Sequence, residues 1–195
     1  MAKSFEFLFD FVSPTAYLAW FRLKGVVART GAQMTPVPVF LGGIMQATGN
    51  RPPGTVEAKG RWMRADLEMW AAEHGIPLGR NAHFPVNTLT ILRGATGLLG
   101  DPRFEAYCDA CFRGVWRDGR DMARPEEIAA ALGEVIGAEE LTALATDPAN
   151  KARLKEATDG AVARGVFGAP SVFVDERLFF GQDRLDWVER ALAEG

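Results

Sequence analysis

A hydroxyl at the start of a helix is the first feature of this sequence that could do chemistry. Ser13 and Pro14 follow a short apolar segment and precede a run with helical periodicity. Serine caps helix N-termini through its side-chain oxygen, and proline suits the first helical position because its missing N–H would have no partner there. Such a terminus carries partial positive charge, so a thiolate beside Ser13 would be stabilised. The simpler interpretation is that Ser13 only caps the helix.

A proline in front of a strand near the C-terminus is the second such feature. Pro170 stands between Ala169 and the apolar run from Ser171 to Val174. A cis peptide bond here would hold the backbone of Ala169 open. Its N–H and C=O would then be free to pair with an extended, peptide-like ligand, as an added strand does. The alternative is a trans proline that begins the strand and has no other role.

The two cysteines, Cys108 and Cys111, form a C-x-x-C sequence of the kind that dithiol oxidoreductases use. They lie inside a helical pattern with Phe104, Tyr107 and Val115, which predicts buried, unreactive thiols. Zinc binding is not expected, because the sequence offers no two further ligands at a suitable spacing.

The chain also has two histidines. His74 falls on the apolar face of a predicted helix, and we expect it to be structural. His83 opens the segment 83–87, which is expected either to line the pocket of a second substrate or to be a plain loop.

The elements that would position these residues begin with a strand. Four phenylalanines alternate between positions 5 and 11, which is the period of a strand with one buried face. The helix that starts at Ser13 is expected to end at Gly31. A second strand is predicted over 33–41, at a sheet edge because its two prolines lack N–H donors.

The rest of the chain is predicted to be mostly helical until it returns to strands. The expected helices cover 55–74, 87–99, 104–116, 125–136, 139–145 and 149–164. Short apolar strands follow at 171–174 and 178–180, and a last helix begins near Asp183.

Strands at both ends of the chain cannot bury their faces separately, so they should join in one sheet. This predicts an α/β fold: a thioredoxin-like sheet (β-α-β … β-β-α) interrupted by a large all-helical insertion. The predicted domains are a discontinuous thioredoxin-like domain, 1–41 with 165–195, and a helical insertion domain, 42–164.

The composition indicates an ordinary globular protein. In 195 residues, 48% are apolar and 24% charged, and the net charge is −3. This balance gives no support for nucleic-acid binding, and no apolar run approaches the ~18 residues that a membrane span needs. Charged residues near the N-terminus interrupt any signal-peptide core. We therefore expect a cytoplasmic protein without a disulfide framework.

Several motifs together resemble one family. They are Ser-Pro-Thr-Ala-Tyr-Leu at 13–18, Gly-Ala-Pro-Ser at 168–171 and Gly-Gln-Asp-Arg-Leu at 181–185. The sequence in this respect resembles the 2-hydroxychromene-2-carboxylate isomerases, which belong with the kappa-class glutathione transferases in the DsbA-like branch of thioredoxin folds. Segments 41–45 and 49–54, and Lys59-Gly60, are similar to kappa-class sequence in particular. The resemblance covers essentially the whole chain, in the family's order.

This resemblance implies glutathione as cofactor. Ser13 stands where a redox thioredoxin carries its attacking cysteine, and it would hydrogen-bond the glutathione sulfur. The cysteinyl backbone of glutathione would lie against Ala169 and Pro170. Its γ-glutamyl end would be held by Gly181, Gln182, Asp183 and Arg184. The glycyl carboxylate or the second substrate would meet Asn50 and Lys59. The alternative for Lys59 is a solvated helix residue.

The implied function is a glutathione-dependent isomerase of aromatic compound degradation. It would interconvert 2-hydroxychromene-2-carboxylate and trans-o-hydroxybenzylidenepyruvate, or act on a related aromatic-derived 2-oxo acid. A thiolate would add reversibly to a conjugated carbon, the bond would rotate, and elimination would return glutathione unchanged. The alternatives are a kappa-type transferase or peroxidase, a DsbA-like dithiol oxidoreductase and a redox-dead thioredoxin-like binding module. The resemblance also implies a homodimer.

Overall fold

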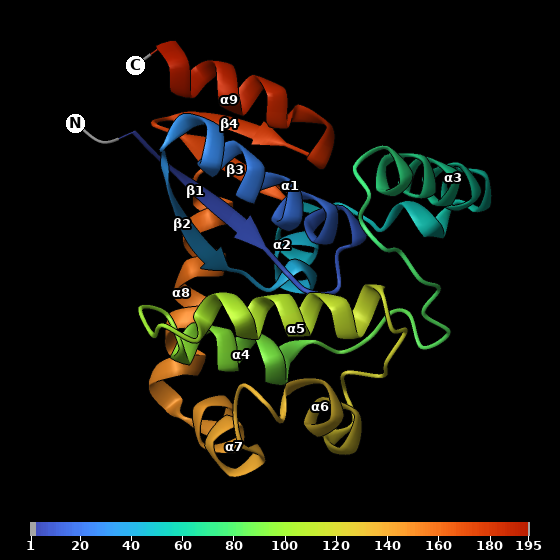
Figure 1. Ribbon diagram of the computed structural model, residues 1–195, viewed down its shortest axis with the longest axis vertical. Helices are drawn as coiled ribbons and strands as arrows, with labels where there is room; N and C mark the ends of the chain where they lie inside the picture. The colour runs from blue at the N-terminus through green and yellow to red at the C-terminus, as the bar shows by residue number, and fades with distance from the viewer. Residues whose placement is uncertain (1–2, 195) are drawn as a thin grey trace.

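A four-stranded sheet with helices on both faces organises the chain in our computed structural model, which describes residues 3–194 (Figure 1). The strand order is β2-β1-β3-β4, with β1 parallel to β2 and antiparallel to β3. The sheet layer consists of β1 (Ser4–Phe9), α1 (Pro14–Thr30), β2 (Gln33–Pro38), β3 (Ser171–Val174), β4 (Arg177–Phe180) and α9 (Leu185–Glu194). The expected β-α-β and β-β-α units in one sheet are confirmed.

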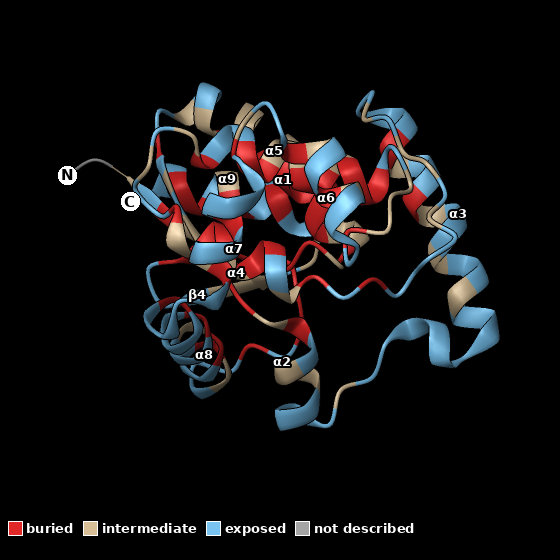
Figure 2. Ribbon diagram, turned by 90° about the horizontal axis from the view of Figure 1, so that it is seen from below, coloured by how far each residue is buried: buried red, intermediate tan, exposed pale blue. Residues whose placement is uncertain are grey.

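Helices occupy most of the chain between β2 and β3. They are α2 (Leu41–Thr48), α3 (Glu57–Glu73), α4 (Leu89–Gly97), α5 (Phe104–Trp116), α6 (Pro125–Leu132), α7 (Ala138–Thr146) and α8 (Pro148–Ala163). Figure 1 shows α4 to α7 at the end of the sheet toward which β1 and β2 point, and α3 to one side. Figure 2 shows the contrast in burial between α5, which is largely buried, and α3, which is largely exposed. Within residues 3–194, no helix is long and apolar enough to cross a bilayer.

Strand β1 is buried on both faces, which differs from the single buried face that the sequence predicts. Phe7 and Phe9 pack with Trp20 of α1. Leu8 points the other way and is also buried, in a second cluster with Ile44 of α2. The reason is that β1 lies in the middle of the sheet, with helices covering each side.

Strand β2 lies at the edge of the sheet, as its prolines predict. Pro36 and Pro38 pair in register with Phe7 and Phe9 of β1, so their missing donors affect only the open side or the strand end. The predicted end of α1 is also confirmed, because Gly31 adopts the left-handed conformation with φ +67°.

Two local expectations need correction. The helix α3 ends at Glu73, before a turn at Gly75 with φ +61°. His74 therefore caps the helix, is exposed and stacks on Trp70, and does not lie on a buried face. At the C-terminal end, a 3-10 turn over Gln182–Arg184 precedes α9, which begins at Leu185 and not at Asp183.

The division into a sheet domain and a helical insertion domain stays a prediction. Aromatic contacts join the two parts: the ring centroid of Phe112 on α5 lies 5.7 Å from that of Phe9 and 4.8 Å from that of Phe11. One hydrophobic core therefore includes residues of β1, α1 and α5.

Candidate active site

Ser13 lies where β1 gives way to α1. Its hydroxyl oxygen accepts a hydrogen bond from the backbone N–H of Ala16 at 3.1 Å, so the predicted cap is confirmed. Only 3% of the residue is exposed. The hydroxyl is thus both buried and placed among the free N–H groups of the first helical turn, where partial positive charge accumulates.

The same hydroxyl reaches the loop before β3. Ser13 Oγ donates to the carbonyl oxygen of Ala169 at 2.9 Å, and the Ala169–Pro170 bond is cis, as the sequence indicated. The expectation of a free Ala169 carbonyl is wrong, because hydroxyl groups from the start of α1 occupy it. By contrast, none of the hydrogen bonds found within residues 3–194 uses the N–H of Ala169.

Thr15 is a site residue that the sequence interpretation missed. Its hydroxyl lies 3.0 Å from Ser13 Oγ and 3.3 Å from the Ala169 carbonyl oxygen. Two hydroxyl groups therefore share one carbonyl acceptor. The sequence signal that could have identified Thr15 is a second hydroxyl residue two positions after the cap, in the first turn of the same helix.

Asp10 was also missed, although it is a carboxylate in an otherwise apolar run. It is fully buried and accepts hydrogen bonds from Val12 N–H at 3.0 Å, Leu41 N–H at 2.9 Å and the Thr88 hydroxyl at 2.6 Å. Burial raises the pKa of Asp10, while these three donors act in the opposite direction. The backbone N–H of Ser13 donates to Asp10 O at 3.0 Å. Asp10 thus ties the Ser13 turn to the starts of α2 and α4.

The segment from Gly181 to Arg184 lies beside the cis proline. The Gly181 N–H donates to the Pro170 carbonyl at 3.0 Å. Gly181 has φ +101°, and a Cβ there would come within 2.5 Å of Asp183 Oδ1, so glycine is required. The carboxylate of Asp183 pairs with Arg184 at 2.7 Å, and both side chains are largely exposed. A negative and a positive group therefore stand together at this end of the site.

Gln182 is held in place by Arg22, which the sequence analysis did not identify as a site residue. One guanidinium nitrogen of Arg22 donates to both Gln182 O and Gln182 Oε1, each at 2.5 Å. Gln182 is only 2% exposed. Because the donor is charged and both acceptors belong to one residue, Arg22 fixes the conformation of this segment.

The other two predicted ligands differ in position. Asn50 Nδ2 donates to the Phe167 carbonyl at 2.7 Å, which places Asn50 against the loop before the cis proline. Lys59 is exposed on α3, and within residues 3–194 it forms no hydrogen bond or ion pair with the site. The structure therefore places Asn50 against the loop that contains Ala169, the residue to which Ser13 donates. It does not place Lys59 there.

Aromatic side chains flank this loop. Phe167 and Phe180 lie with ring centroids 4.5 Å apart, and each is 41% exposed. Phe180 packs so close over Gly168 that a Cβ there would approach its ring to 2.8 Å. These rings offer an apolar surface next to the cis proline.

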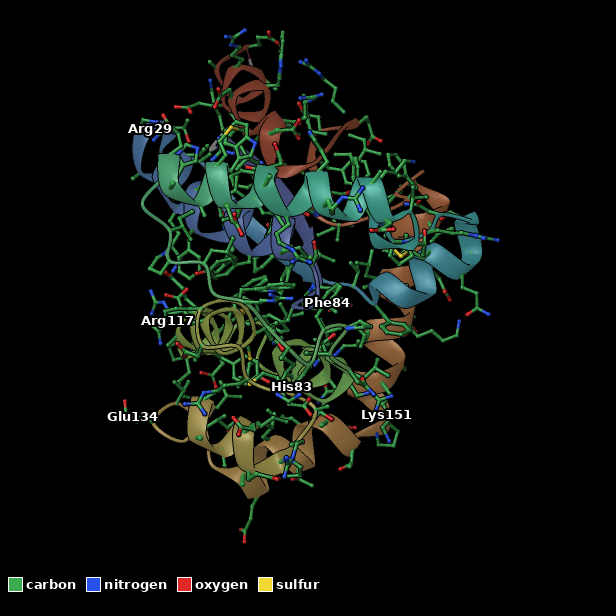
Figure 3. All side chains as sticks on the ribbon, turned by 90° about the vertical axis from the view of Figure 1, so that its right-hand side faces the viewer. Arg29, His83, Phe84, Arg117, Glu134 and Lys151 are labelled. Carbon is green, nitrogen blue, oxygen red and sulfur yellow. The ribbon has the colours of Figure 1, made fainter. Side chains whose placement is uncertain are left out.

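The segment 83–87 is a loop on the face shown in Figure 3, below α3. Phe84 is half exposed and packs on Trp116, with ring centroids 5.6 Å apart. Trp116 in turn donates its indole N–H to Phe11 O at 2.8 Å, two residues before Ser13. The loop is thereby fixed to the Ser13 turn, while His83 points outward as an exposed side chain.

Cys108 and Cys111 are fully buried in α5, as predicted. Burial raises the pKa of both thiols well above the ordinary value, and the other charges near Cys108 have smaller effects. A buried thiol of raised pKa is a poor nucleophile. The burial of these two thiols therefore favours the Ser13 turn, and not the cysteine pair, as the position of the active site.

Comparison with known proteins shows which family has this sequence and fold. A sequence model of the DSBA-like thioredoxin domain matches residues 5–193. A 2-hydroxychromene-2-carboxylate isomerase of Sphingobium xenophagum is 34% identical over the full length of both chains. Human glutathione S-transferase kappa 1 is 28% identical, over 100% of this chain and 92% of its own. A solved 2-hydroxychromene-2-carboxylate isomerase has a TM-score of 0.89 and 27% identity, over 98% of this chain and 95% of that one.

Proposed function

Because this chain belongs to the family of DSBA-like thioredoxin domains and, within it, is related to the 2-hydroxychromene-2-carboxylate isomerases, we propose that it is a glutathione-dependent isomerase. Its substrate would be 2-hydroxychromene-2-carboxylate, with trans-o-hydroxybenzylidenepyruvate as product, or a related aromatic-derived 2-oxo acid. The observation that carries this proposal is the Ser13 hydroxyl, held at the N-terminus of α1 against Ala169 and the cis proline.

The residues around Ser13 fit glutathione. The N–H of Ala169, which has no partner within residues 3–194, suits a carbonyl of the cysteinyl unit. Asp183 and Arg184 offer one charge of each sign, which suits the ammonium and carboxylate of the γ-glutamyl end. Gly181 lets the backbone there take a positive φ, and Arg22 holds the buried Gln182 in place. These residues would together bind the tripeptide in an extended form.

Asn50 and Lys59 would hold the other end. Asn50 already contacts the loop beside Ala169, so a glycyl carboxylate or the second substrate would lie within its reach. Lys59 is exposed on α3 and would contribute charge from a greater distance. Its contribution is expected to be smaller and more sensitive to salt.

The role of Ser13 follows from its hydrogen bonds. Bound glutathione supplies a thiol whose thiolate form adds reversibly to a conjugated carbon of the substrate. To stabilise that sulfur, Ser13 must turn its proton away from Ala169 O, to which it now donates. Thr15 lies 3.3 Å from the same oxygen and would keep it paired. The hydroxyl and the N-terminus of α1 would then lower the pKa of the thiol by about one to two units.

A kappa-type transferase or peroxidase is the second candidate, and the match to human glutathione S-transferase kappa 1 favours it. The exposed rings of Phe167 and Phe180 would suit an aromatic substrate of either enzyme. A transferase would release the conjugate, whereas an isomerase returns glutathione unchanged.

We further propose that the protein is cytoplasmic, forms a homodimer and acts in the breakdown of aromatic compounds. Sedimentation equilibrium would test the dimer.

The experiment that tests the proposal is an assay of the purified protein with 2-hydroxychromene-2-carboxylate, followed by absorbance with and without glutathione. We expect turnover that requires glutathione and leaves its concentration unchanged. Conjugation of a simple aromatic electrophile, without isomerisation, would replace the isomerase by a transferase. Absence of both reactions, together with reduction of insulin by the protein with dithiothreitol, would favour a dithiol oxidoreductase.

A further inference from the structure

A cavity lies on the far side of α1 from the strands, between α1, α9 and the end of α3. Its volume is about 260 Å³. Figure 3 shows the C-terminal end of α3 beside the part of α1 that carries Arg29, with α9 above both. Apolar and charged residues line it together: Phe21, Arg22, Gly25, Val26, Arg29, His74, Ile76, Leu185 and Asp186.

Arg22 is the notable group in this lining. Its side chain is only 10% exposed. One terminal nitrogen donates to Gln182, but within residues 3–194 no hydrogen bond uses Nε or the other terminal nitrogen. Burial lowers the pKa of Arg22, and only Asp186 and Asp183 counter that effect. A guanidinium remains charged even so, and its two unused donor nitrogens are not sealed from solvent, so a ligand in the cavity could reach them.

The other charged groups of the cavity do not satisfy Arg22. Asp186 is 3.8 Å away, and its side chain is 81% exposed, so water screens the pair. Arg29 is already neutralised by two hydrogen bonds to Glu189. Burial and the charge of Arg22 lower the pKa of His74, which disfavours a second cation beside Arg22. Arg22 is therefore the group that an added anion would meet.

We propose that this cavity binds a small carboxylate with a flat apolar body, its carboxylate paired with Arg22 and its body against Phe21. A planar carboxylate matches the two unused donor directions of a guanidinium better than a spherical anion does. Of the apolar lining residues, Phe21 is partly exposed, whereas Val26 and Leu185 are almost fully buried, so the flat body would lie mainly against Phe21. The ring of Trp70 lies 4.8 Å from the Arg22 guanidinium carbon, and this cation–π contact helps to fix the position of that group.

The proposal does not depend on the glutathione site, because the ligand needs neither Ser13 nor Ala169. Arg22 nevertheless joins the two places, since it also donates to Gln182. A shift in the position of Gln182 on binding would make the two sites interact. The binding test therefore needs no enzyme activity.

The test is a titration of the whole protein with benzoate, followed by amide NMR at Gly25 and by the indole N–H of Trp70. Benzamide, which has the same shape without the charge, is the comparison ligand. We expect saturable shifts with benzoate, at a dissociation constant on the order of 1 mM, and at least about tenfold weaker binding of benzamide. Equal shifts with both ligands would overturn the role of Arg22.

Three variants complete the design. Gly25→Leu fills the cavity, and its Cβ meets only the flexible end of Arg29 at 3.1 Å, so the fold should tolerate it. It should abolish the benzoate shifts without removing charge. Arg22→Gln should weaken binding about tenfold, whereas Arg190→Gln, which removes the same charge outside the lining, should not. Unchanged benzoate binding in Gly25→Leu would contradict the proposed site. Equal losses of benzoate affinity in the two arginine variants would show that surface charge alone causes the binding, and would also contradict it.

Discussion

The hydroxyl of Ser13 donates to the carbonyl oxygen of Ala169 at 2.9 Å, across 156 positions of sequence. This bond joins the first strand-to-helix turn to the cis-proline loop. It also sets the resting direction of the Ser13 proton, which must turn toward a thiol if Ser13 acts on glutathione.

Ser13→Ala should slow isomerisation and raise the pKa of the thiol group of glutathione bound to the protein. Loss of one hydrogen bond to a thiolate corresponds to about one pKa unit, or about 1.4 kcal/mol, and so to about a tenfold lower rate at neutral pH. The thiolate absorbance of the bound tripeptide against pH measures this directly. Thr15→Val is the matched variant: it leaves Ser13 in place and should cost less. Unchanged kinetics of Ser13→Ala at saturating glutathione would remove Ser13 from the mechanism.

Asp183→Asn should weaken binding of glutathione but not of cysteinylglycine, which lacks the γ-glutamyl unit. A charge-assisted hydrogen bond to an ammonium contributes about 1.5 kcal/mol, which corresponds to about a tenfold change in affinity. Calorimetry with both peptides makes the comparison. Asp186→Asn, three residues further on and exposed, serves as the control and should bind both peptides normally. Equal weakening for the two peptides would place the γ-glutamyl end elsewhere.

Asp10→Asn should destabilise the protein, because the new amide group would face the Leu41 N–H with a donor. Leaving one buried donor without an acceptor costs about 1–3 kcal/mol. Thr88→Val removes a single donor to Asp10 and should cost about 1 kcal/mol. Urea unfolding of both variants and of the double variant gives the coupling between the two positions. Additive losses would show that the 2.6 Å contact between them carries no energy.

The two tyrosines should lose their protons only at unusually high pH in the folded protein. Burial raises the pKa of Tyr17 to about 12 and that of Tyr107 well above the ordinary value. A raised pKa means that the folded state holds the proton more tightly than the unfolded state does. This contribution to stability is complete below about pH 10 and is lost as the pH rises through the folded pKa. Near-ultraviolet absorbance should show little tyrosinate at pH values near 10 until urea is added.

Replacing Cys108 and Cys111 by alanine should leave isomerisation intact and lower the stability by about 1–2 kcal/mol, since each change removes a buried sulfur. In the folded wild type, a thiol reagent should react with neither cysteine until denaturant is added. Loss of activity in a variant that still folds would bring the dithiol back into consideration.

Local patterns in the sequence determined the elements and the points where they meet. Alternating phenylalanines predicted β1, the Ser13-Pro14 pair predicted the start of α1, and Gly31 its end. These features depend on residues a few positions apart, because pleat, helix cap and left-handed turn are settled by neighbouring backbone angles. Membership of the family followed from motifs of the same local kind, spaced along the whole chain.

Only the tertiary structure decided which groups are paired. The Ala169 carbonyl was expected to be free, yet Ser13 and Thr15 occupy it. Asp10 accepts from Thr88, 78 positions away, and Arg22 holds Gln182 across 160 positions. A buried polar group must find a partner, but which partner it finds depends on how the helices pack on the sheet. That packing is a property of the whole core, and no short stretch of sequence contains it.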